Sequence, residues 1–146
     1  MVKQRLRLVI DSDLENVAKV GTTVQSLCVQ ASFSEIEAFH VQLAMVEAIN
    51  NVIKHAYGDQ SGHDVTIDIS VDADKLVFVL TDTGKSMPPF AITPSLEFDP
   101  DDLDAVPEGG MGLFIIHSVM DKVDYQACDG RNVQTFVKHL PSAKSA

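Results

Sequence analysis

The chain has 146 residues, of which 45% are hydrophobic, and its formal net charge is −10 at pH 7. This length and apolar content predict one compact domain over residues 1–146 and exclude a disordered chain. The acidic balance argues against nucleic acid as a direct partner, because phosphate-backbone binding needs clustered Lys and Arg.

Membrane and secretory signals are absent from the sequence. No apolar run approaches the roughly 18 residues that a membrane span needs, and the N-terminal segment lacks the continuous apolar stretch of a signal peptide. We therefore expect a cytoplasmic protein without membrane contact. Cys28 and Cys128 are interpreted as reduced thiols, with a disulfide as the alternative.

The start of the chain predicts a strand followed by a helix. Residues Gln4–Ile10 alternate between apolar and polar side chains, as in a half-buried strand. Ser12 and Glu15 form an S-x-x-E pattern, which is typical of a capping box. We therefore expect the first helix to begin here, with Ser12 as its cap.

A second S-x-x-E pattern, at Ser34 and Glu37, predicts a long helix. This helix should end at Gly58, because glycine suits the left-handed position that follows a helix. Later in the chain, alternating segments predict four strands, at 65–71, 76–81, 123–127 and 133–137. One more helix is expected over 113–120.

Between the strand at 76–81 and that last helix lies a long loop, Met87–Gly110, rich in proline and acidic residues. Loops of this length are uncommon in compact domains and are usually functional or mobile.

Three motifs carry candidate chemistry, and the first lies on the long helix. Glu47, Asn51, Lys54 and His55 are spaced at i, i+4, i+7 and i+8, which places them on one helical face. The alternative is an ordinary solvated face.

The second motif is Asp82-Thr-Gly84, at the end of a predicted strand. An aspartate there can accept a hydrogen bond from an amine in a pocket, and the glycine lets a flat ligand approach the backbone. An ordinary turn is the alternative.

The third motif, E-G-G-M-G-L over 108–113, opens the helix after the long loop. Glycines at a helix N-terminus expose N–H groups that can hold phosphate oxygens. The motif matches neither a P-loop nor a dinucleotide-binding fingerprint, and a flexible hinge is the alternative.

In this order, E-x-x-x-N-x-x-K-H-x-Y, D-x-G and P-E-G-G-x-G-L resemble the ATP-binding boxes of the GHKL ATPases, whose domain is the Bergerat fold. The resemblance covers nearly the whole chain and is closest to bacterial anti-sigma-factor serine kinases, above all over 107–121. It implies an α+β two-layer sandwich, with helices on one face of a mixed, mostly antiparallel sheet. ATP would lie between the helices and a lid at about 88–109.

The resemblance also implies residue roles. Glu47 matches the catalytic acid, and a carboxylate can accept the proton of a serine hydroxyl during phosphoryl transfer. Asn51 matches the Mg²⁺ ligand, and Asp82 the residue that binds the adenine amino group. The other nucleotide-binding positions are Lys54, His55, Gly84, Met87, Gly110, Met111, Gly112, Leu113 and Thr135.

Several of these roles have alternatives. His55 has a structural role as its alternative, and Met87 is either in the adenine pocket or in the core. Some family members carry a lid arginine, whereas residues 88–107 here contain no Lys or Arg. Lys54, Lys85 or a group of the substrate would then neutralise the transferring phosphoryl group.

The function that the resemblance implies is Mg-ATP-dependent phosphorylation of a serine on a STAS-domain anti-anti-sigma protein, coupled by partner switching to inhibition of a sigma factor. A homodimer is implied as well. One alternative is a histidine-kinase-like catalytic domain. It is disfavoured because the chain has no room for a phosphoacceptor domain and because histidine kinases usually carry Asn at the Glu47 position. The other alternative is a non-catalytic, ATP-gated binding module.

Overall fold

The computed structural model describes the backbone of residues 2–87 and 110–141, and the predicted lid at 88–109 lies outside this part. The elements, in chain order, are β1 (Val2–Asp11), the 3₁₀ turn η1 (Leu14–Asn16), α1 (Val17–Gln30), α2 (Glu35–Asn51), the π-helix η2 (Val52–Ala56), β2 (Asp64–Asp72), β3 (Lys75–Asp82), α3 (Gly110–Val119), β4 (Lys122–Cys128) and β5 (Arg131–His139).

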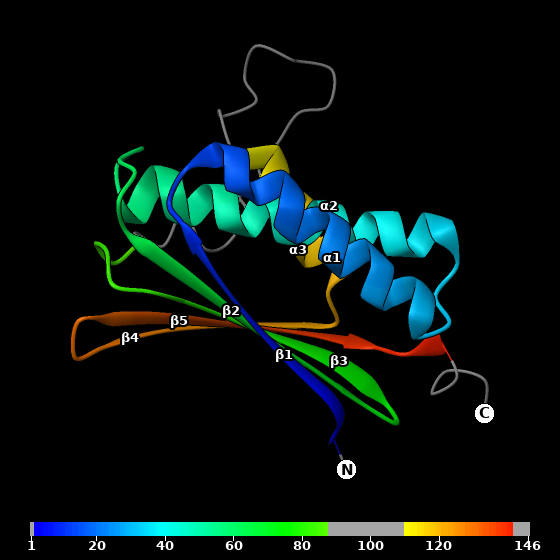
Figure 1. The fold of residues 1–146 in the computed structure, drawn as a ribbon. Helices are drawn as coiled ribbons and strands as arrows, with labels where there is room; N and C mark the ends of the chain where they lie inside the picture. Colours follow the sequence, from blue (N-terminus) through cyan, green and yellow to red (C-terminus); the bar gives the residue numbers. More distant parts are fainter. Residues whose placement is uncertain (1, 88–109, 142–146) are drawn as a thin grey trace.

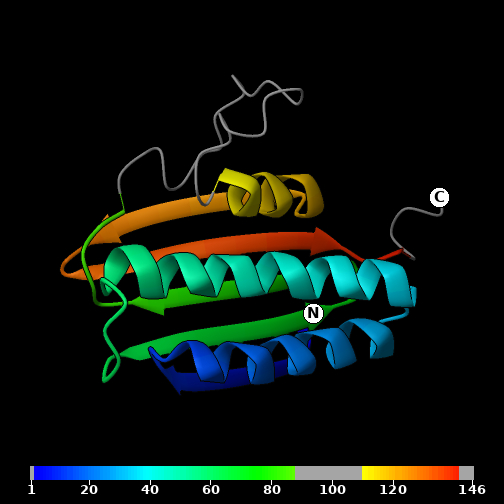
Figure 2. The same cartoon turned by 90° about the horizontal axis from the view of Figure 1, so that it is seen from above.

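The strands form one sheet in the order β1-β2-β3-β5-β4, and all four pairings among the described strands are antiparallel. The three α-helices lie on one face of this sheet (Figure 1). Seen from above, α2 lies between α1 and α3 (Figure 2) and packs against both. The predicted α+β class, with helices on one face of a largely antiparallel sheet, is confirmed.

The core lies between the helices and the sheet. Along β2, β3 and β5, every second side chain is buried against the helices, which is the period expected of a half-covered sheet. Phe78 and Phe136 are opposite each other on β3 and β5 and are the largest fully buried side chains. Truncating either to alanine would cost about 3–5 kcal/mol.

Close packing of α1 on α2 depends on Gly21. A Cβ atom built there would lie 2.9 Å from Cγ2 of Val46, so only glycine allows this helix separation. Cys28, on the same helix, is fully buried, and burial raises the pKa of its thiol to about 12. Cys28 is therefore a neutral core residue, whereas Cys128 is a free, exposed thiol.

The predicted helix caps are partly confirmed. Ser34 accepts a hydrogen bond from the amide of Glu37 at 3.1 Å, as a capping residue should. Ser12 does not cap α1: its hydroxyl is buried and donates to the Gln60 carbonyl at 2.6 Å. The cap of η1 is instead Asp13. The S-x-x-E pattern at Ser12 therefore does not mark a helix cap, because the Ser12 hydroxyl binds the loop before β2 instead.

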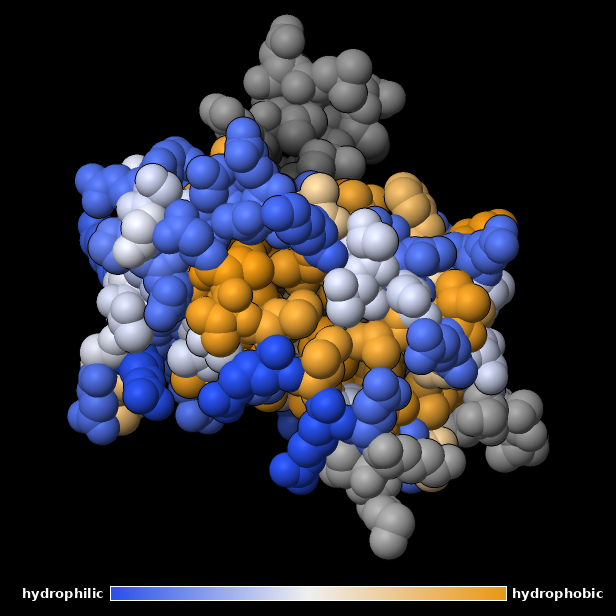
Figure 3. Space-filling model, viewed as in Figure 1, coloured by the Kyte–Doolittle hydropathy of each residue, from blue (hydrophilic) through white to orange (hydrophobic). Residues whose placement is uncertain are grey.

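The edge of the sheet at β1 is incompletely covered. Leu6, Leu8 and Ile10 are only partly buried against the core, and apolar surface shows between β1 and α1 in the view of Figure 1 (Figure 3). Within the described residues, no helix is long and apolar enough to cross a bilayer.

Candidate functional site

The first part of the site is where α2 meets the start of α3. A Cβ atom on Gly112 would lie 2.5 Å from Oε2 of Glu47, closer than real Cβ atoms come to other atoms. Glycine at 112 is therefore what allows the Glu47 carboxylate to lie against the first turn of α3. A helix N-terminus carries unpaired N–H groups and a partial positive charge, which together favour bound anions. The structure thus brings together a carboxylate and a potential phosphate site.

The first motif continues past the end of α2, so Lys54 and His55 lie in a different kind of helix from Asn51. Asn51 is the last residue of α2 and is only 8% exposed. The chain then continues as a π-helix, in which the Tyr57 amide donates to the Val52 carbonyl at 3.1 Å. Lys54 and His55 lie in this wider turn and are exposed. The predicted single face therefore holds only as far as Asn51, and π turns occur frequently at functional sites.

The second part of the site is Asp82, the last residue of β3, which is 1% exposed. Its Oδ1 accepts from the amide of Gly84 at 2.9 Å and from Nδ2 of Asn132 at 2.7 Å. Its Oδ2 is buried and has no hydrogen-bond partner among the described residues. Burial raises the pKa of Asp82 above its ordinary value, while the two hydrogen bonds act to lower it. A buried acceptor without a donor is unfavourable and points to a ligand donor.

An unpaired donor faces the same side of the sheet. Gln134 on β5 is 8% exposed, and its Nε2 is buried without a partner in the described part of the chain. Gln134 is opposite Leu80, and Asn132 is opposite Asp82, so all three polar side chains face the helices. The edge of adenine carries an amino donor beside a ring-nitrogen acceptor. The unpaired acceptor and donor here are the two kinds of group that complement that edge.

Thr135 is not part of this group. It is opposite Val79 and is partly exposed, whereas its neighbours Gln134 and Phe136 are buried. Successive side chains of a strand point to opposite faces, so Thr135 lies on the sheet face away from Asp82. The prediction that Thr135 lies near the base, on the side of Asp82, is therefore wrong.

The packing of the chain requires glycine at position 84, whether or not a ligand is bound. A Cβ atom there would overlap the carbonyl of Ala56 in the π-helix, and the amide of Lys85 donates to that same carbonyl at 2.8 Å. The D-x-G turn is thus held directly against η2. This contact explains the glycine without any ligand.

Two residues that hold the turn were not predicted from the sequence. The Tyr57 hydroxyl donates to the Asp64 carbonyl at 2.6 Å and accepts from the Thr83 amide at 2.9 Å. The Asn132 amide also donates to the Gly84 carbonyl at 3.0 Å.

Met87 follows the turn and is buried in the hydrophobic core cluster, and its expected place in the adenine pocket stays a prediction. Its amide donates to the hydroxyl of Tyr125 at 2.9 Å, and that hydroxyl donates to Oδ1 of Asn132 at 3.1 Å. Tyr125 therefore connects the end of the described segment before the lid to the Asp82 network.

Residues 110–113 of the glycine-rich motif form the first turn of α3. This helix begins at Gly110, Met111 is its second residue, and Leu113 is buried in the core. The described residues contain no group of three or more His, Cys, Asp or Glu that could hold a metal. The magnesium role expected of Asn51 stays a prediction.

The sequence profile of the family described as "Histidine kinase-like ATPase domain" matches residues 10–138. The chain is 26% identical over 137 residues to the serine-protein kinase RsbW of Bacillus velezensis, covering 88% of this chain and 81% of the relative. It is 30% identical over 118 residues to the serine-protein kinase RsbW of Staphylococcus aureus, covering 78% of this chain and 74% of the relative.

A solved structure of the RsbU and RsbW domains of a Mycobacterium tuberculosis protein shares the fold, with a TM-score of 0.66 at 12% identity. The match covers 94% of this chain and 33% of the longer mycobacterial chain. The profile match over most of the length, together with a relative at 30% identity, leads to one conclusion: the chain belongs to the histidine kinase-like ATPase domain family.

Proposed function

We propose that this protein is an ATP-dependent serine kinase that phosphorylates a STAS-domain protein and, by partner switching, binds and inhibits a sigma factor. The observation that carries the proposal is the Glu47 carboxylate lying against the first turn of α3 at Gly112. The names of the relatives, serine-protein kinases, support the same activity.

In the proposed reaction, a bond forms between the serine Oγ and the γ-phosphorus of ATP, and the bond from that phosphorus to the β–γ bridging oxygen breaks. The serine proton passes to Glu47, and ADP leaves. The first-turn amides of α3 stabilise phosphate charge. A magnesium ion, when bound, neutralises further phosphate charge, and the side-chain oxygen of Asn51 is the protein ligand we propose for it.

The adenine base is proposed to bind at the two buried polar atoms without hydrogen-bond partners, one on β3 and one on β5. Oδ2 of Asp82 would accept from the exocyclic amine, and Nε2 of Gln134 would donate to a ring nitrogen. Both atoms are buried and lack partners among the described residues, so binding would satisfy them at little further desolvation cost.

A hydroxyl acceptor suits this site better than a histidine acceptor. An imidazole already has a lone pair for attack and needs no base, whereas a serine hydroxyl must lose its proton. The position of Glu47 beside the proposed phosphate site therefore favours the serine kinase over the histidine-kinase-like alternative.

The test is incubation of the purified protein with γ-labelled Mg-ATP and a STAS-domain protein encoded beside its gene. We expect acid-stable label on one serine or threonine. Glu47→Gln should keep nucleotide binding and lower transfer by about 10²–10⁴, the usual contribution of general base catalysis. Nucleotide binding without transfer to any STAS protein would leave only the non-catalytic module.

The partner switch is tested separately, by capture of candidate sigma factors and STAS proteins with ATP and with ADP. We expect the two partners to displace each other, in a nucleotide-dependent way, on a cytoplasmic homodimer. Light scattering measures the dimer. Retention of no sigma factor under either nucleotide would remove the anti-sigma role and leave the kinase activity standing.

A further inference from the structure

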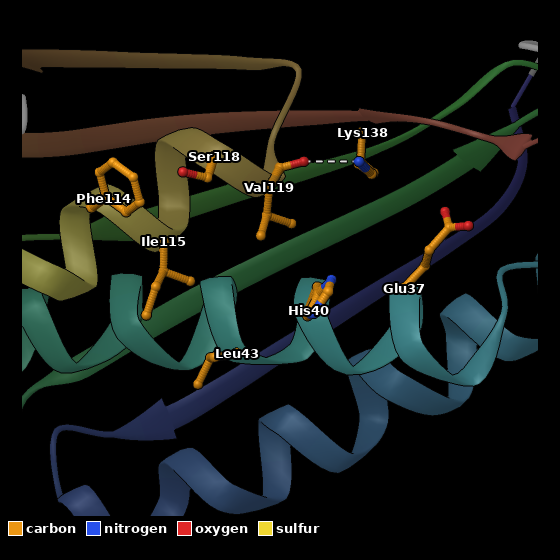
Figure 4. A pocket seen from close by; sticks show the side chains of 8 residues that line it. All are labelled: Glu37, His40, Leu43, Phe114, Ile115, Ser118, Val119 and Lys138. Carbon is orange, nitrogen blue, oxygen red and sulfur yellow. Dashed lines mark hydrogen bonds between the residues drawn. The ribbon is translucent and has the colours of Figure 1, made fainter.

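A hollow of about 410 Å³ lies on the surface between α2 and α3, and we call it the α2–α3 groove. Its apolar lining comes from Leu43 on α2 and from Phe114, Ile115 and Val119 on α3 (Figure 4). Glu37 and His40 line it near the start of α2. The groove is open to solvent, because both residues and Phe114 are exposed.

Phe114 is the most unusual residue of the groove. Its neighbours Leu113 and Ile116 are buried in the core, whereas Phe114 is 53% exposed. Leaving a large apolar surface in water is unfavourable by about 25 cal/mol per Å². An exposed aromatic ring beside a ready-made hollow is typical of a binding anchor.

The Phe114 end of the groove lies toward the Glu47 carboxylate. Helices α2 and α3 run in opposite directions side by side (Figure 2), and Gly112 at the start of α3 contacts Glu47. Phe114 follows Gly112 by two residues. On α2, Leu43 precedes Glu47 by one helical turn and therefore lies on the same side of the helix. Among the described residues, Phe114 and Leu43 are thus the members of the lining that lie nearest in sequence to the Gly112–Glu47 contact.

We propose that the α2–α3 groove docks the protein substrate through apolar side chains next to its acceptor serine. This inference rests on the proposed kinase function. A protein kinase of this kind must hold a serine beside Glu47, and Phe114 of the groove follows by two residues the glycine that contacts that carboxylate. The partner is therefore a protein segment with an apolar face and a serine at one end.

The lining of the groove also includes charged groups. Lys138 donates to the Val119 carbonyl at 2.8 Å (Figure 4), so its ammonium group is held at the end of α3. The exposed carboxylate of the lining is Glu37. The lining therefore carries one positive and one negative group, and its apolar residues are what we expect the docked segment to match.

The first test compares two phenylalanines. Phe39 is 55% exposed on α2 and does not line the groove, so Phe39→Ala is a matched control for Phe114→Ala. With the STAS-domain protein as substrate, we expect Phe114→Ala to raise KM about tenfold or more. The Kd for ADP and the kcat should stay within about twofold. Phe39→Ala should change none of these values.

A second test does not depend on a loss of activity. Phe114→p-benzoylphenylalanine keeps a large aromatic side chain and cross-links to its neighbours under light. With a non-hydrolysable ATP analogue, the cross-link should map to the substrate segment that contains the phosphorylated serine.

The outcomes separate the two proposals. Wild-type transfer with an unchanged KM for Phe114→Ala, an equal rise of KM for Phe39→Ala, or a cross-link far from the serine would each overturn the docking groove and leave the kinase standing. If the wild-type protein binds ADP but phosphorylates no STAS protein, the proposed function fails and the docking proposal fails with it.

Discussion

At the scale of single residues, Asp82 occupies a position that is unfavourable without a ligand. Its Oδ2 is buried with no partner among the described residues, and burial raises the pKa of the carboxyl group. Asp82→Asn should therefore leave the free energy of unfolding unchanged or higher. Affinity for ADP should fall about tenfold to a hundredfold, because a hydrogen bond to a charged acceptor contributes about 1.5–3 kcal/mol. Denaturant unfolding and calorimetry measure the two effects.

The same carboxyl group predicts a pH dependence. Just above the ordinary pKa of 3.8, the folded state still binds the Asp82 proton while the unfolded state has lost it. The free energy of unfolding therefore falls as pH rises through this window, by a contribution that Asp82→Asn lacks. ADP affinity should change in the opposite direction and fall as pH is lowered through the raised pKa. Equal pH profiles for wild type and Asp82→Asn would contradict this role.

Gln134 offers a paired test on one strand. Gln134→Leu removes a buried donor that has no partner in the described part of the chain, so the free energy of unfolding should not fall. Affinity for ADP should decrease about tenfold, the value of one ordinary hydrogen bond. Thr135→Val is the control, because Thr135 lies on the other sheet face. If Thr135→Val weakens ADP binding and Gln134→Leu does not, our assignment of the two faces is wrong.

At the scale of elements, the contact between α2 and α3 links structure to catalysis. Alanine is favoured over glycine inside a helix by about 1 kcal/mol, so helix propensity alone predicts that Gly112→Ala stabilises α3. Its Cβ atom would, however, lie 2.5 Å from Oε2 of Glu47, and the carboxylate would have to move. We expect kcat to fall at least tenfold, since small displacements of a catalytic group are costly, with ADP affinity largely kept.

A double variant checks this explanation. If Gly112→Ala acts by displacing Glu47, adding it to Glu47→Ala should lower kcat no further, because coupled residues are non-additive. An additive loss would mean that Gly112 acts through phosphate binding instead. Both single variants should unfold at denaturant concentrations close to that of the wild type.

The elements also show where sequence reasoning worked. Strands with strict alternation, such as β2 and β3, were predicted within one residue of their bounds, because a half-covered sheet imposes period two on the sequence. The π-helix at the end of α2 left no such signal, since its wider turn is fixed by tertiary contacts such as the Tyr57 hydroxyl bonds. The capping pattern predicted the cap correctly at Ser34. It failed at Ser12, whose hydroxyl donates to the Gln60 carbonyl instead.

The candidate site was predictable to different depths. Motif order pointed to Glu47, Asp82 and Gly112. The structure places Asp82 at the end of β3 and places Glu47, within α2, against Gly112 in the first turn of α3. The hydrogen-bonding roles of Asn132 and Gln134 depend on which strand lies beside β3. That neighbour is β5, which is distant in sequence. Pairing across such a distance cannot be deduced from one strand's pattern. The error at Thr135 has another cause: the buried face of β5 carries the polar residues Asn132 and Gln134 beside Phe136, so the face was not evident from the sequence.

At the scale of the whole molecule, the two halves of the site come from different parts of the chain. Asp82 and Gln134 lie on the sheet, and Asn51 and Gly112 lie on the helices. A nucleotide that contacts both layers would connect them. Its binding should therefore appear in global stability as well as in local contacts, because a ligand specific for the native state opposes unfolding.

The final prediction concerns this global effect. At an ADP concentration 100 times its Kd, the native state gains about 2.7 kcal/mol, which corresponds to a rise in Tm of roughly 5–10 °C for a chain of this size. Differential scanning calorimetry with ADP and Mg²⁺ measures the shift. Asp82→Asn should lose most of it at the same ADP concentration. Asn51→Ala should lose the part that depends on Mg²⁺, because its side chain is the proposed metal ligand. No shift at millimolar ADP with Mg²⁺ would contradict the nucleotide site as a whole.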